Sequence, residues 1–240
     1  MGKDVIIACD FSSAKETYEF LNQFGRQRPF VKIGMELFYA EGPDMVRQLK
    51  ERGHKIFLDL KLHDIPNTVN KAMKVLGRLQ VDMCNVHAAG TEKMMRAALE
   101  GLTEGSAKAG PAAPAQRPLL IAVTQLTSTS QKQLEEDLLI HRSMEEVVAS
   151  YAALTKQAGL DGVVCSPLEA PVVHQQLGSE FLTITPGVRL AGDAAADQTR
   201  VTTPAKAKEL GSDYIVVGRS ITGAANPVAA YERCCSEFIG

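Results

Sequence analysis

Short apolar segments rich in Val, Ile, Leu and Phe recur at regular intervals along the chain. Most of them lack the polar alternation of a strand that has one wet face, and such runs are typical of strands buried in a parallel sheet. We therefore predict eight buried parallel strands: Val5–Cys9, Phe30–Met35, Lys55–Leu60, Met83–His87, Leu119–Thr124, Gly162–Cys165, Phe181–Thr185 and Tyr214–Val217.

The segments between these runs are of helical character, many with apolar residues three and four apart. The predicted helices are Ala14–Phe24, Pro43–Arg52, Thr68–Leu79, Thr91–Leu102, Met144–Ala158, Leu168–Leu177, Pro204–Leu210 and Pro227–Phe238. Eight strand–helix units in 240 residues fit one (β/α)8 barrel, which typically has about 250 residues. The predicted fold class is therefore α/β, a single (β/α)8 TIM barrel over residues 1–240. A doubly wound open sheet is the alternative.

Two segments stand apart from this alternation. Gly105–Pro118 is biased toward small residues and proline, which indicates an exposed loop on the side of the barrel away from the chemistry. Gln131–His141 indicates a short amphipathic insertion after the fifth strand, packing over the mouth or at a subunit contact. No function is predicted for either segment.

Composition narrows the class of protein. The chain is 45% hydrophobic and 22% charged, as expected for a globular protein with a large core, and its net charge of -2 offers no positive field for a polyanion. No stretch approaches the roughly 20 apolar residues of a membrane span, and no signal peptide is evident, so we expect a cytoplasmic protein. The five cysteines show no C-x-x-C spacing, which favours reduced structural thiols.

Charged residues interrupt the apolar runs where a barrel places its active site, at the carboxyl ends of the strands. Asp59 and Lys61 end the third run, and their spacing of two puts both side chains on one face of the strand. Lys32 lies inside the second run between Val31 and Ile33, so it also points inward if its neighbours pack outward. The result is a confined array of alternating charge, which is tolerable only when neutralised and hydrogen-bonded.

One interpretation of this array is a structural ion-pair network between two strands. A catalytic interpretation gains support because Asp10, Thr124 and Arg219 converge on the same rim, with Asp64 in the following loop. Flanking carboxylates favour the charged form of an amine. We therefore expect Lys61 to donate a proton or stabilise a carbanion, because a Schiff base requires a neutral amine.

A phosphate site is predicted after the last two strands, in the segments I-T-P-G-V-R (184–189) and V-V-G-R-S-I-T (216–222). These loops are the usual phosphate site of the barrel, with backbone N–H groups facing the anion. Gly218 permits close approach of the backbone, and Arg219 can form two bonds to phosphate oxygens. The small-residue segment Gly187–Thr203 is a candidate lid, with Gln198 as a contact.

The sequence offers no convincing metal site. His87 ends the fourth run, but no second histidine occupies a comparable strand end, so we interpret it as a hydrogen-bonded rim residue. Asp59 and Asp64 carry oxygen ligands suited to Mg²⁺, yet Lys32 and Lys61 compete for the same space. We therefore predict neither a metal nor another cofactor.

Taken together, these motifs resemble the bacterial orotidine 5'-phosphate decarboxylase family over essentially the whole chain. The resemblance rests on I-A-C-D ending at Asp10, V-K-I-G around Lys32, D-L-K-L-H-D-I-P-N-T over residues 59–68, the Thr124-Gln125 strand end, T-P-G-V-R and V-V-G-R-S-I-T. It implies cofactor-free decarboxylation of orotidine 5'-phosphate to uridine 5'-phosphate and CO2, the last step of UMP biosynthesis.

The resemblance also implies roles for single residues. Lys61 would protonate C6 of the pyrimidine, with Asp59 and Lys32 orienting it and with Lys32 and Asp10 contacting the ribose hydroxyls. Asp64 and Thr68 would come from the partner subunit of a homodimer, and Thr124 would bind the pyrimidine. The residues on the phosphate side would be Arg189, Gln198, Gly218 and Arg219.

Two alternative functions stay open. D-x-K-x-x-D also occurs in Mg²⁺-dependent relatives acting on sugar phosphates, such as 3-keto-L-gulonate 6-phosphate decarboxylase. Those relatives place an acidic residue where this chain has Lys32, and they lack the following I-P-N-T. The other alternative is a sensor that binds a phosphate ligand without turning it over.

Overall fold

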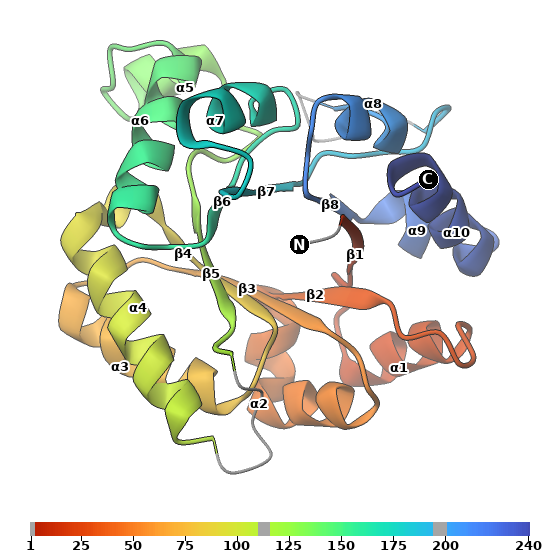
Figure 1. The fold of residues 1–240 in the computed structure, drawn as a ribbon. Helices are drawn as coiled ribbons and strands as arrows, with labels where there is room; N and C mark the ends of the chain where they lie inside the picture. Colours follow the sequence, from red (N-terminus) through yellow and green to blue (C-terminus); the bar gives the residue numbers. More distant parts are fainter. Residues whose placement is uncertain (1–2, 110–115, 194–200) are drawn as a thin grey trace.

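In this computed structural model, which describes residues 3–109, 116–193 and 201–240, eight parallel strands close into a barrel in chain order. Figure 1 shows the strands at the centre of the molecule. The strands are β1 (Asp4–Ala8), β2 (Phe30–Gly34), β3 (Ile56–Leu62), β4 (Met83–His87), β5 (Leu119–Val123), β6 (Gly162–Val164), β7 (Leu182–Thr185) and β8 (Tyr214–Val217). The predicted (β/α)8 barrel is confirmed, and the doubly wound alternative is wrong.

Helices surround the barrel (Figure 1). They are α1 (Ala14–Asn22), α2 (Met35–Glu51), α3 (Pro66–Arg78), α4 (Thr91–Ala107), α5 (Gln131–Glu136), α6 (Met144–Gln157), α7 (Ala170–Leu177), α8 (Pro204–Glu209), α9 (Arg219–Thr222) and α10 (Pro227–Phe238), with a 3-10 turn at Ala88–Gly90. Most bounds lie within two residues of the prediction. Helix α2 begins eight residues before the predicted Pro43, because a kink at Gly42, with φ of 72°, joins two helical segments.

The prediction of a loop from Gly105 onward is wrong in its first three residues, since α4 continues to Ala107. The physical reason is close packing of α4 on α3. A Cβ at Gly101 or Gly105 would collide with the backbone oxygen of Asn70 or Lys74, and a Cβ at Gly77 would meet the backbone of α4. Glycine is thus used here for close approach of two helices, and this contact fixes α3, whose first turn holds Thr68.

Residues alternate between the two faces of the barrel wall, and this alternation decides which side chains reach the mouth. Phe30, Phe57, Met83 and Tyr214 belong to the cluster that fills the barrel interior. Val31, Ile33 and Leu58 belong to the larger cluster between strands and helices. On each strand, the residue two positions after one of these interior residues therefore also faces the barrel axis.

The amino-terminal ends of the strands are tied by a repeated contact. An aspartate just before β4, β6 and β8 accepts a hydrogen bond from a backbone N–H of β3, β5 and β7 respectively. The pairs are Asp82 with Ile56 at 2.7 Å, Asp161 with Leu120 at 2.7 Å and Asp213 with Thr183 at 2.8 Å. Each aspartate also meets a basic side chain, namely Lys50, Arg117 or His174. These contacts stabilise the end of the barrel opposite the polar mouth.

Two further expectations from the sequence concern membrane-spanning helices and the chemical state of the cysteines. Among the helices in the described part of the chain, none is long and apolar enough to cross a membrane. Burial raises the pKa of the Cys9 and Cys84 thiols to about 12, so both are neutral at physiological pH.

Candidate active site

The carboxyl end of β3 carries two charged residues on the inner side of the barrel. Asp59 and Lys61 both follow Phe57 on the inward row, as predicted from their spacing. The strand is not regular here: Leu58 pairs with Cys84 and Leu62 with Val86, so β3 has more residues than β4 in this interval. This irregularity is a β-bulge, a device that redirects side chains next to active sites.

Lys61 lies within the bulge in a left-handed backbone conformation, with φ of 52°. A non-glycine residue in this region costs on the order of 1 kcal/mol, so the surrounding contacts must hold it there. Its backbone N–H donates to the Oδ1 atom of Asn85 on β4 at 2.8 Å. The Nδ2 atom of Asn85 donates in turn to Oδ1 of Asp59 at 2.7 Å.

Four charged side chains, from β2, from β3 and from the segment after β1, form one connected network. The Nζ atom of Lys61 lies 2.8 Å from Asp59 Oδ1, and the Nζ atom of Lys32 lies 3.4 Å from Asp59 Oδ2. Lys32 also donates to Oδ1 of Asp10 at 2.8 Å. Asp59 is the buried centre of the network, with a side chain 10% exposed, whereas the Asp10 side chain is 61% exposed at its edge.

Electrostatics keeps the centre of this network ionised. Burial alone would raise the pKa of the Asp59 carboxyl, but the Lys32 and Lys61 ammonium groups outweigh burial and lower that pKa. Burial alone would lower the pKa of the Lys32 ammonium, but the Asp59 and Asp10 carboxylates outweigh it and raise that pKa. The arrangement is therefore an array of fixed charges.

Two adjoining cavities open at the mouth of the barrel, and both include Lys32, Pro186 and Val216 in their walls. The smaller, which we call the lysine cavity, measures about 230 Å³ and is lined by Lys32, Phe57, Asp59, Lys61, Val123, Gln125, Leu126, Thr127, Ser128, Val164, Pro186 and Val216. The larger, the arginine cavity, measures about 450 Å³ and is lined by Ala8, Asp10, Lys32, Pro186, Gly187, Val188, Arg189, Val216, Gly218, Arg219, Ser220 and Thr222. Their volumes lie in the range of ligand pockets, about 300–1,000 Å³, when the two are taken as one site.

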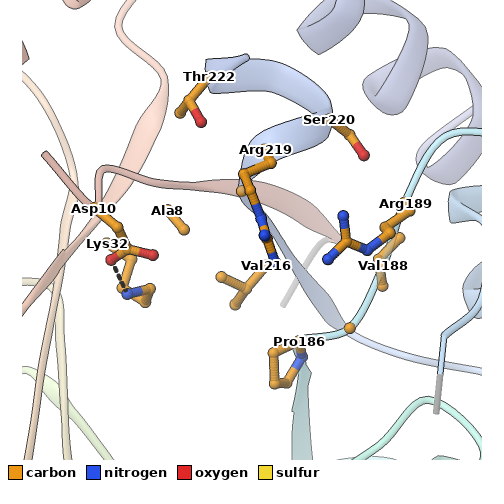
Figure 2. Close-up of a pocket in the computed structure, with 12 residues that line it drawn as sticks. Ala8, Asp10, Lys32, Pro186, Val188, Arg189, Val216, Arg219, Ser220 and Thr222 are labelled. Atoms are coloured by element: carbon orange, nitrogen blue, oxygen red, sulfur yellow. Dashed lines mark hydrogen bonds and ion pairs between the residues drawn. The ribbon is translucent and has the colours of Figure 1, made fainter. Parts of the chain in front are cut away.

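The arginine cavity gathers positive charge from two separate loops. Figure 2 shows the Arg189 and Arg219 side chains extending toward one another, while the Asp10–Lys32 ion pair lies on the other side of Val216. Gly218 precedes the short helix α9, which Arg219 begins. The predicted phosphate-side residues Arg189, Gly218 and Arg219 thus line the same cavity.

Three predicted site residues lie outside the walls of both cavities. Thr124 is only 2% exposed, and its hydroxyl donates to the carbonyl oxygen of Val164 at 3.0 Å. Asp64 and Thr68 are exposed at the rim, and Asp64 Oδ1 accepts from the N–H of Ile65 at 2.6 Å. Their contacts with a ligand stay predictions.

The predicted lid is described only at its two ends. Val188 forms an isolated β-bridge with Thr202, and the Arg189 N–H donates to the Thr202 carbonyl oxygen at 2.9 Å. Gln198 lies outside the described residues, as does the segment 194–200. The two described ends pair with one another beside the arginine cavity.

His87 lies at the end of β4, with its ring centroid 5.8 Å from that of His63. Burial, together with the nearby His63 and Lys61 side chains, lowers the pKa of His87, so the neutral ring is favoured. Within the described ranges, no group of three or more His, Cys, Asp or Glu side chains is arranged to hold a metal ion. The interpretation of His87 as a rim residue stays a prediction.

Sequence reasoning missed Asn85 and the pocket residues Leu126 to Ser128, and it noted Gln125 at the end of the fifth strand without giving it a role. Asn85 gave a usable signal, because it is the one amide in the apolar run M-C-N-V-H. A polar residue on an inner strand position is costly to bury unless it is hydrogen-bonded, so it indicates a partner. Its partners depend on the bulge, which the sequence did not predict.

Comparison with known proteins gives a consistent result. The model of the Orotidine 5'-phosphate decarboxylase / HUMPS family matches residues 3–234. A protein of Bacillus cytotoxicus called orotidine 5'-phosphate decarboxylase is 57% identical over 240 residues, covering 100% of this chain and 99% of its own. One of the same name from Geobacillus sp. is 58% identical over 240 residues, covering 100% and 98% respectively. The crystal structure of orotidine 5'-phosphate decarboxylase from Lactobacillus acidophilus superimposes with a TM-score of 0.87 at 43% identity, covering 99% of this chain and 100% of that one.

Proposed function

The chain belongs to the Orotidine 5'-phosphate decarboxylase / HUMPS family, and we propose that Lys61 and the network around it carry out its reaction. That reaction is the decarboxylation of orotidine 5'-phosphate in pyrimidine biosynthesis, the activity named for its full-length relatives at 57% and 58% identity. One observation carries the assignment of residues. The Lys61 ammonium lies 2.8 Å from Asp59 in the wall of a cavity that adjoins a second cavity containing two arginines.

In the proposed reaction, the bond between C6 of the pyrimidine and its carboxylate breaks and CO2 leaves. The electron pair of that bond stays on C6, and a proton from the Lys61 ammonium forms the new C6–H bond of uridine 5'-phosphate. Solvent then reprotonates the amine. Because negative charge moves from the carboxylate to C6 next to a fixed ammonium, Lys61 stabilises the transition state more than the bound substrate.

The arginine cavity is the proposed site of the phosphate group. Arg189 and Arg219 supply guanidinium groups for its oxygens, and Gly218 allows the backbone to approach closely. Lys32 and Asp10, which border this cavity as an ion pair, suit the ribose hydroxyls between phosphate and pyrimidine. Gln198 completes the phosphate side in this proposal. The phosphate group lies far from C6, yet the energy of binding it can hold the pyrimidine in place for the reaction.

The proposed pyrimidine end is the lysine cavity. Residues Gln125 to Ser128, which follow β5, form one wall of this cavity. Thr124 holds the start of this wall through its bond to Val164 on β6, and we keep the proposal that it contacts the pyrimidine.

The proposed functional unit is a homodimer in which Asp64 and Thr68 reach the partner subunit's site. Both residues are exposed, as is Ile65 between them at 65%, so the rim presents an apolar side chain flanked by polar ones. Asp64 placed beside the substrate carboxylate would add electrostatic repulsion that is relieved when CO2 departs.

The proposed roles are tested by removing Lys61. The wild-type chain should consume orotidine 5'-phosphate, measured as loss of the absorbance of the orotate ring. Lys61→Ala should still bind uridine 5'-phosphate by calorimetry but should not turn over the substrate. A Lys61→Ala enzyme with wild-type kcat would refute the role given to this residue, and a wild-type chain that binds the nucleotide without releasing CO2 would support the sensor alternative.

A chelation experiment separates the metal-dependent alternative. Extensive dialysis against EDTA should leave kcat unchanged if fixed ammonium groups supply the positive charge. Loss of activity on chelation, restored by Mg²⁺, would support a sugar-phosphate type of chemistry.

Mixed dimers test the shared site. A Lys61→Ala subunit and an Asp64→Ala subunit, each inactive alone, form a hybrid with one complete site. Random mixing should then restore up to about a quarter of the wild-type activity, since half of the dimers are hybrids with one working site of two. No recovery in a preparation shown to exchange subunits would place Asp64 in its own subunit's site.

A further inference from the structure

We propose that Asn85 is a positioning residue for this reaction, which holds Lys61 where its ammonium can deliver a proton. The inference rests on the proposed role of Lys61. It concerns a side chain that lines neither cavity and lies behind the charged network.

The location of Asn85 follows from the broken register between β3 and β4. Leu58 pairs with Cys84 and Leu62 with Val86, so Asn85 is the single β4 residue opposite residues 59–61. The surplus residues of a bulge lose their regular partners in the ladder of backbone hydrogen bonds. One of these surplus residues is Lys61, whose backbone is left-handed.

The side-chain amide of Asn85 forms hydrogen bonds with the first and the last residue of this irregular segment, Asp59 and Lys61. Its Oδ1 atom accepts from the Lys61 backbone N–H at 2.8 Å, and its Nδ2 atom donates to Asp59 Oδ1 at 2.7 Å. The same Asp59 oxygen lies 2.8 Å from the Lys61 ammonium. Asn85, Asp59 and Lys61 therefore close a ring of contacts that fixes the lysine at its backbone and at the tip of its side chain.

Burial and chemistry make the amide specific for this task. Asn85 is 1% exposed, so solvent is not at hand to replace its two bonds. The task needs one acceptor and one donor on the same short side chain, which excludes apolar residues and excludes aspartate, a pure acceptor when ionised. A residue that only filled space would be apolar, as Met83 is on the same inner row of β4.

Asn85→Ala should lower kcat about 100-fold, the scale of loss when a reacting group is displaced by about 1 Å. Affinity for uridine 5'-phosphate should stay close to wild type, because the proposed phosphate and ribose contacts come from other strands. Asn85→Asp is nearly isosteric. It keeps the acceptor for the Lys61 backbone N–H, but it loses the donor to Asp59 and places a second carboxylate against that residue. It should also lose most of kcat, and it remains informative if the alanine variant does not fold.

A matched control is Thr155→Val on α6, which removes another fully buried polar group, one that bonds to Tyr151 of its own helix at 2.7 Å. It should lose stability without losing kcat.

Wild-type kcat in either Asn85 variant would overturn the proposal, as would equal losses of kcat and of nucleotide affinity. A crystal structure of Asn85→Ala gives a readout without turnover: Lys61 should leave its left-handed conformation or move away from Asp59, and an unmoved Lys61 overturns the proposal. A wild-type chain without decarboxylase activity would overturn the proposed function instead, and the crystal structure would still decide the role of Asn85.

Discussion

Removing the negative charge at the centre of the mouth should cost both stability and turnover. In Asp59→Asn, two ammonium groups lose the carboxylate that lies 2.8 Å from Lys61 and 3.4 Å from Lys32. Breaking a buried ion pair by removing one partner costs about 3–5 kcal/mol. We expect the low end, about 3 kcal/mol, because Lys32 keeps Asp10 and because the Lys61 side chain is 26% exposed and partly solvated. The turnover number should fall at least about 100-fold, since Lys61 loses the group that orients it.

The opposite end of the barrel supplies the control. Asp161 bonds to Arg117 at 2.6 and 3.0 Å and accepts from a backbone N–H of β5, so it is also a carboxylate with a basic and an amide partner. Asp161→Asn should lower the free energy of unfolding, measured by urea denaturation, yet retain kcat. Both variants would be assayed for loss of orotate absorbance under conditions where each is folded. If Asp59→Asn retains kcat within about twofold, or if Asp161→Asn loses as much kcat, the assignment of the reacting site to Asp59 and Lys61 is wrong.

Three further predictions concern phosphate binding, pH and helix packing. Arg219→Ala should lower kcat/KM about 10- to 100-fold, the equivalent of charge-assisted hydrogen bonds worth about 1.5–3 kcal/mol, and unchanged kinetics would remove Arg219 from the site. The pKa of Asp59 is lowered in the folded chain, so its stabilising effect is present above its unfolded pKa of about 3.9 and is lost as pH falls through the folded value. The difference in unfolding free energy between wild type and Asp59→Asn should therefore narrow on acidification below about pH 4, and a constant difference would contradict the ion-pair interpretation. Gly101→Ala should destabilise the chain by about 1–3 kcal/mol, because a Cβ there meets the α3 backbone, whereas an unchanged urea midpoint would show that the two helices separate freely.

The amino-acid sequence by itself determined the architecture of this protein. Eight apolar runs alternating with amphipathic segments sufficed for the barrel, because hydrophobic periodicity is local and each unit repeats the same requirement to bury one strand between two layers. It also determined that Lys32, Asp59 and Lys61 face inward. Side chains alternate between the two faces of a strand, and the apolar neighbours of these residues pack outward against the helices. Arg189, Gly218 and Arg219 could be assigned to one cavity because loops after consecutive strands meet at the same end of a barrel.

Only the tertiary structure decided how these groups are held. The bulge in β3 arises from the pairing of β3 with β4, a contact between residues about 26 positions apart that no local pattern encodes. It places Lys61 in a left-handed conformation and gives Asn85 its two partners. The extension of α4 over residues predicted as loop likewise depends on glycines meeting the backbone of α3. Local periodicity thus specifies which residues face the mouth, whereas long-range register and close packing specify the distances at which chemistry occurs.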